Sequence, residues 1–132
     1  MSISLTAQDH TTIRTAAFGA VTLMSFAAVR SAHEVATDGT LALASATGAV
    51  GHVLAGKKRD FKLEAKSSAA LAEQVLPALT ASVRLLEAQD PAEAANFRTT
   101  VTVAVEAAAR AHQGESPALD AMTGKITAAL NA

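Results

Sequence analysis

The stretch TAAFGAVTLMSFAAV, residues 15–29, decides the fold, because it runs between two arginines without a single charged side chain. A helix of this length rises roughly 22 Å, whereas a bilayer core needs about 20 residues and 30 Å. A secretion signal would start with basic residues and be more strongly apolar, but Asp9 and His10 precede this stretch and small residues fill much of it. We therefore expect neither a membrane span nor a cleaved leader.

The apolar residues in and around this stretch cover the whole circumference of a helix. At 100° per residue they form three stripes: Ile13, Ala17, Val21, Met24, Ala28 and Val35; then Phe18, Thr22, Ser25 and Val29; then Leu23 and Phe26. A helix that is apolar on all sides is wrapped by other helices or covered by a second subunit. The stretch predicts the central helix of a bundle.

Length and composition favour one helical domain over residues 1–132. Alanine, the best helix former, contributes 33 residues, and the four aromatic residues are all phenylalanine. The net charge of -1 gives no field to attract nucleic acid or a membrane surface, and the absence of cysteine excludes disulfides and thiolate sites. We expect a cytoplasmic protein without cofactor, nucleic-acid or membrane partner.

Turn and cap signals divide the first half of the chain into two helices and a connector. The first helix is predicted from about Ala7 to Thr37, before the turn dipeptide Asp38-Gly39. The second is predicted from Thr40 to Ala55, with Gly56 just past its end. The segment KKRDFKLEAK, residues 57–66, alternates apolar and charged residues from Phe61 onward and predicts an extended connector, with a short strand as the alternative. Its basic residues complement a helix C-terminus better than they predict a nucleic-acid site.

The second half has clearer helix starts. Ser67 or Ser68 is expected to cap a third helix, with Pro77 on its solvent side. Asp90 precedes Pro91 as the cap of a fourth helix, with Glu93 expected to complete a capping box.

Gly114 ends the fourth helix, and Ser116-Pro117 opens a fifth. The apolar stripe of that last helix comprises Leu119, Met122, Ile126 and Leu130. Short connections favour antiparallel neighbours. The sequence therefore predicts an all-α, compact bundle of about five helices, mostly antiparallel, around a long central N-terminal helix.

Small residues form an unusual second face on the predicted helix 40–55. This face comprises Ala44, Gly48, Gly51 and Ala55. A glycine inside a helix costs about 1 kcal/mol relative to alanine, so two of them indicate that something approaches the backbone closely. The candidates are a tight crossing with the first helix, a helix of a partner subunit, or a ligand. His52, at the edge of this face, is predicted either to line an internal cavity or to be a core histidine bonded to a carbonyl.

No residue pattern predicts a catalytic or metal site. The dinuclear iron pattern Glu-x-x-His is absent, and His33 and Glu34 are adjacent, so they diverge by 100° on a helix. We expect a protein that acts by association, as a homodimer or an adaptor. A bundle enclosing a small apolar ligand is the alternative, and a metal-dependent enzyme comes third. The predicted interface or ligand residues are Ala44, Gly48, Gly51, His52, Ala55, Phe18, Thr22 and Ser25.

Overall fold

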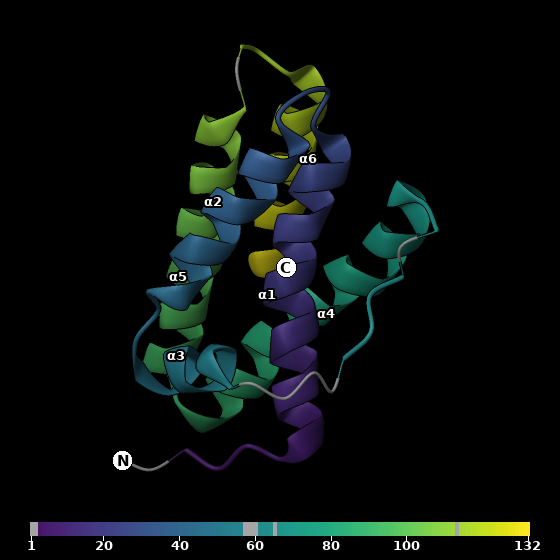
Figure 1. The fold of residues 1–132 in the computed structure, drawn as a ribbon. Coiled ribbons are helices and arrows are strands. Elements are labelled where there is room, and N and C mark those ends of the chain that lie inside the picture. Colours follow the sequence, from purple (N-terminus) through teal and green to yellow (C-terminus); the bar gives the residue numbers. More distant parts are fainter. Residues whose placement is uncertain (1–2, 57–60, 65, 113) are drawn as a thin grey trace.

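A computed structural model describes residues 3–56, 61–64, 66–112 and 114–132, and within these ranges the chain forms six α-helices and no β-strand (Figure 1). The helices are α1 (Ala7–Ala27), α2 (Ala32–Ala44), α3 (Gly48–Ala55), α4 (Ser68–Gln89), α5 (Pro91–Ala111) and α6 (Pro117–Leu130). They pack into a compact bundle with contacts between many helix pairs. The predicted all-α bundle is thus confirmed.

Helix α1 occupies the centre of the bundle. In the described part of the chain it contacts each of the other helices. From Ile13 to Met24 every residue is buried except Phe18 and Thr22, which are half-buried. The uncharged stretch therefore contains the central helix that its wheel predicts, although Phe26 and Val29 near the end of the stretch are exposed.

The predicted helix from Ala7 to Thr37 is wrong, because the chain leaves the helix after Ala27 and α2 returns alongside α1 (Figure 1). Ser31 in the turn has a left-handed backbone with φ 60°. The dipeptide Asp38-Gly39 lies inside α2 instead of forming a turn. Gly39 is a packing residue, since a Cβ there would come within 2.7 Å of a Val21 methyl group.

The predicted helix from Thr40 to Ala55 also breaks, at residues 45–47 between α2 and α3. Gly48 is the first residue of α3 and has φ +73°, a backbone conformation that favours glycine. Gly48 therefore provides the positive φ with which α3 begins, and it does not lie inside a continuous helix.

The starts of the last three helices agree with the sequence. In each of them the side chain of the cap residue accepts a hydrogen bond from a backbone N–H of the first turn. The pairs of acceptor and donor are Ser67 and Ala70, Asp90 and Ala92, and Ser116 and Leu119. Pro77 is exposed, as its position on the wheel predicts. The buried residues of α6 are the predicted Leu119, Met122, Ile126 and Leu130.

Helix α4 holds an extended segment near each of its ends with a glutamine side chain. The amide of Gln74 donates to the carbonyl of Lys62 at 2.7 Å and accepts from the N–H of Glu64 at 2.8 Å. The amide of Gln89 pairs in the same way with the carbonyl and N–H of Ser4. Each glutamine thus satisfies backbone groups that no helix or sheet would satisfy.

Residues 61–64 of the predicted connector have no regular structure, while residues 57–60 and 65 of it lie outside the described residues. The Phe61 ring stacks on the Phe18 ring with centroids 5.7 Å apart. The described part of the connector therefore lies on α1 as well as on α4. By length and composition α4 could cross a membrane, but a core helix of a bundle meets the same criteria.

Candidate interface on α2 and α5

The small-residue face predicted for helix 40–55 is used inside the chain. A Cβ on Gly51 would lie 2.3 Å from the carbonyl oxygen of Ala46, so glycine lets the backbone turn tightly between α2 and α3. A Cβ on Gly48 would lie 2.9 Å from a carboxylate oxygen of Glu93 on α5. The close approach is therefore intrachain, and it involves the turn and α5 instead of the predicted crossing with the first helix.

Helix α5 caps the start of α3. Thr47 makes no side-chain cap, and Glu93 Oε1 accepts the N–H of Val50 at 3.1 Å in its place. Asn96 Nδ2 donates to the carbonyl of Thr47 at 2.8 Å. The capping box predicted for Glu93 is wrong, because its side chain serves α3 while the N–H of Asp90 donates to Leu86.

A buried arginine, Arg14, contacts the C-terminal end of α3. Arg14 Nε donates to the carbonyl of Val53 at 3.0 Å, and a Cβ on Gly56 would lie 2.3 Å from Arg14 Nη2. A cation at a helix C-terminus is favourable because the last carbonyls carry partial negative charge. This role of Arg14 was not predicted, since an arginine at the end of an apolar stretch usually lies in solvent.

The other predicted site residues do not meet in one place. His52 is exposed on α3, so it neither lines an internal cavity nor belongs to the core, and both interpretations of it are wrong. Ala44 and Ala55 are exposed as well.

On α1, the predicted stripe of Phe18, Thr22 and Ser25 is occupied by contacts within the chain. Phe18 lies against Phe61, the Thr22 hydroxyl donates to the Phe18 carbonyl at 2.9 Å, and the Ser25 hydroxyl donates to the Ala32 carbonyl at 3.3 Å. All three residues are half-buried. This stripe of α1 offers less free surface than its apolar wheel indicates.

Two large apolar side chains are exposed on neighbouring helices instead. Leu41 on α2 is 64% exposed, and Val103 on α5 is 45% exposed. Helices α2 and α5 pack against each other along their length, as Figure 1 shows. Neither residue is among the predicted site residues, although a helical wheel places Leu41 on the outer side of its helix, opposite the buried Leu43.

A small hollow lies between these two helices. Its volume is about 170 Å³. The residues that line it come from the end of α2, the turn that follows, and α5, and none is charged: Ala42, Ser45, Ala46, Thr47, Asn96, Thr99, Thr100 and Val103. Leu41 is next to Ala42 in sequence and one turn before Ser45. We call Leu41, Val103 and the lining of this hollow the α2–α5 face.

No three histidine, aspartate or glutamate side chains in the described ranges come together in a way that could hold a metal ion. Comparison with protein families, with curated proteins and with solved structures finds no match for this chain.

Proposed function

We propose that this chain acts by association, and that two copies form a homodimer through the α2–α5 face. The observation that supports the proposal is an exposed leucine, Leu41, that lies one residue before Ala42 and one helical turn before Ser45, two residues that line an uncharged hollow. In a two-fold dimer the same patch occurs on both sides of the contact. Leu41 of each copy would then enter the hollow of the other.

The chemistry of the α2–α5 face suits burial. Its hollow is lined by alanine, serine, threonine, asparagine and valine, so no charge has to be removed from water when it closes. Burying a leucine side chain contributes about 1.5–3 kcal/mol, and a two-fold contact buries two of them. Association costs at least about 4 kcal/mol in lost motional freedom, so we expect a reversible dimer of modest affinity.

A partner protein that presents a similar apolar side chain would fit the same face, which keeps an adaptor role as the second form of this proposal. We favour the homodimer because the protruding residue and the hollow both belong to one chain. In either form we propose a cytoplasmic association module.

The test is the sedimentation behaviour of Leu41→Glu. A carboxylate at this position would be buried without a partner in the dimer, so we expect the variant to be a folded monomer while the wild type is a dimer at micromolar concentration. The matched control is Val29→Glu, which makes the same kind of change at a residue that is 76% exposed in the turn between α1 and α2. That control should remain dimeric.

Two results would contradict the proposal. One is a wild-type chain that stays monomeric at high micromolar concentration. The other is a dimer that Val29→Glu dissociates and Leu41→Glu leaves intact, which would place the contact on the turn between α1 and α2.

A further inference from the structure

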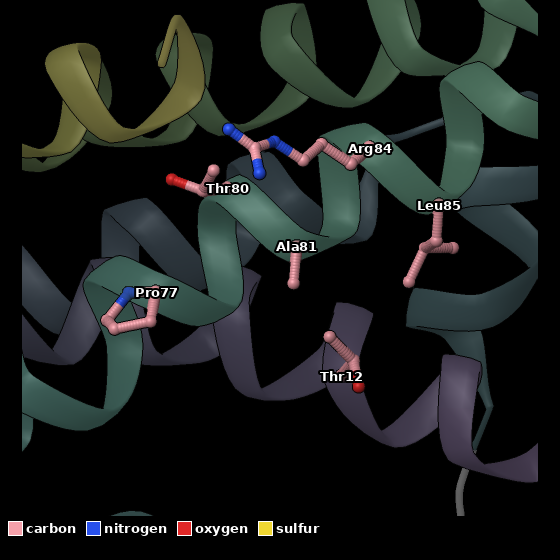
Figure 2. Close-up of a pocket in the computed structure, with 6 residues that line it drawn as sticks. All are labelled: Thr12, Pro77, Thr80, Ala81, Arg84 and Leu85. Atoms are coloured by element: carbon pink, nitrogen blue, oxygen red, sulfur yellow. The ribbon is translucent and has the colours of Figure 1, made fainter.

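A second surface feature lies where α4 crosses α1, in a part of the molecule that the α2–α5 face does not reach. It is an open groove of about 730 Å³ lined by Thr12 of α1 and by Pro77, Thr80, Ala81, Arg84 and Leu85 of α4 (Figure 2). No described residue that lines this groove also lines the hollow between α2 and α5.

The floor of the groove is apolar. Pro77, Ala81 and Leu85 follow one another at intervals of four residues and therefore share a face of α4, with the small Ala81 in the middle. Figure 2 shows Ala81 and Leu85 pointing toward the side on which Thr12 lies. The strip from Pro77 to Leu85 is about 12 Å long at the rise of an α-helix.

The hydroxyl groups beside this strip already have partners. Thr12 donates to the carbonyl of Gln8 at 3.0 Å, and Thr80 donates to the carbonyl of Ala129 at 2.7 Å. They therefore offer a ligand no unsatisfied donor hydrogen. The polar chemistry available at the groove is that of the arginine on its edge.

Among the described residues, Arg84 is the one charged residue that lines the groove. It is exposed, and no ion pair or hydrogen bond of its guanidinium occurs in the described part of the chain. In Figure 2 the guanidinium lies above Thr80, on the side of α4 opposite to Thr12. A guanidinium presents its N–H groups in a planar fork that matches a carboxylate.

We propose that this groove binds an aliphatic carboxylate, with the carboxylate on Arg84 and the chain along Pro77, Ala81 and Leu85. The groove is shallow and open, so a ligand in it would keep one side in solvent. A docked protein would need a contact of roughly 1,000 Å² or more, and six lining residues give much less. The inference does not depend on the proposed dimer.

Titration of the wild-type chain with decanoate, followed by the backbone amide signals in NMR spectra, tests the proposal. We expect saturable shifts at residues 77–85 and at Thr12. Arg84→Gln should weaken binding about tenfold through the loss of a charge-assisted hydrogen bond. Ala81→Leu should fill the groove and also weaken binding; Ala81 is exposed, so the fold should survive.

Arg30→Gln is the matched control, because Arg30 is an exposed arginine in the turn between α1 and α2. It should bind decanoate like the wild type, and decanol should bind the wild type more weakly than decanoate. The proposal is overturned if decanoate causes no saturable shifts in the groove, if Arg84→Gln binds as well as Arg30→Gln, or if Ala81→Leu leaves the affinity unchanged.

Discussion

Replacing Gly51 by alanine should destabilise the protein, although alanine is the better helix former. An added Cβ would lie 2.3 Å from the carbonyl oxygen and 2.6 Å from the carbonyl carbon of Ala46. Both atoms belong to the backbone, so the turn between α2 and α3 would have to shift. Overpacking of this kind costs about 1–3 kcal/mol, which lowers Tm by roughly 4–12 °C in a chain of this size.

Gly124→Ala is the matched control because it is the same change inside another helix. No atom lies within 4 Å of a Cβ added there, so only helix propensity acts, and the variant should gain about 0.5–1 kcal/mol. Thermal unfolding followed by circular dichroism, with sedimentation of each variant, measures both effects. If Gly51→Ala kept the melting temperature of the wild type but sedimented as a smaller species, the close approach to Gly51 would be made by a second subunit. That result would refute the intrachain explanation.

Two further predictions concern the ends of the helices. Glu93→Ala removes the acceptor for the Val50 N–H at the start of α3, so chemical denaturation should show a free energy of unfolding lower by about 1 kcal/mol. Glu93→Gln keeps an acceptor oxygen and should lower it less. Equal stability of the wild type and both variants would disprove the cap. Truncation after Gly114 removes four buried side chains worth about 1.5–3 kcal/mol each, a sum comparable with the whole stability of a domain, so the shortened chain should show no cooperative melt. A truncated chain that melted at the wild-type temperature would show that α6 is not part of the bundle.

The sequence predicts those parts of the fold that local chemistry controls. Asp90 and Ser116 each precede a proline at a helix start, and both cap as expected. The stretch from Thr15 to Met24 is apolar around the whole helix and is buried by its neighbours. In these places backbone preference, side-chain hydrogen bonding and burial all favour the same structure.

The breaks after α1 and α2 could not be predicted in this way, because tertiary packing determines them. The turn at residues 28–31 contains neither glycine nor proline, and Ser31 takes a left-handed backbone there so that α2 can pack on α1. Gly39 carries a turn signal in the sequence, yet it fits against Val21 inside α2, and Gly48, expected inside a helix, begins α3. The hollow of the α2–α5 face depends on the break after α2, because the turn that follows α2 lines it, and a continuous helix 40–55 would not contain it.

The distance between two copies of Glu106 tests the proposed dimer most directly. Glu106 is an exposed residue of α5, three residues after Val103, and the chain has no cysteine, so Glu106→Cys carries a single spin label. Double electron–electron resonance should give a defined distance between the labels of two copies, and adding Leu41→Glu should abolish it. The absence of any dipolar signal at high micromolar concentration, or a distance that Leu41→Glu leaves unchanged, would contradict association through the α2–α5 face.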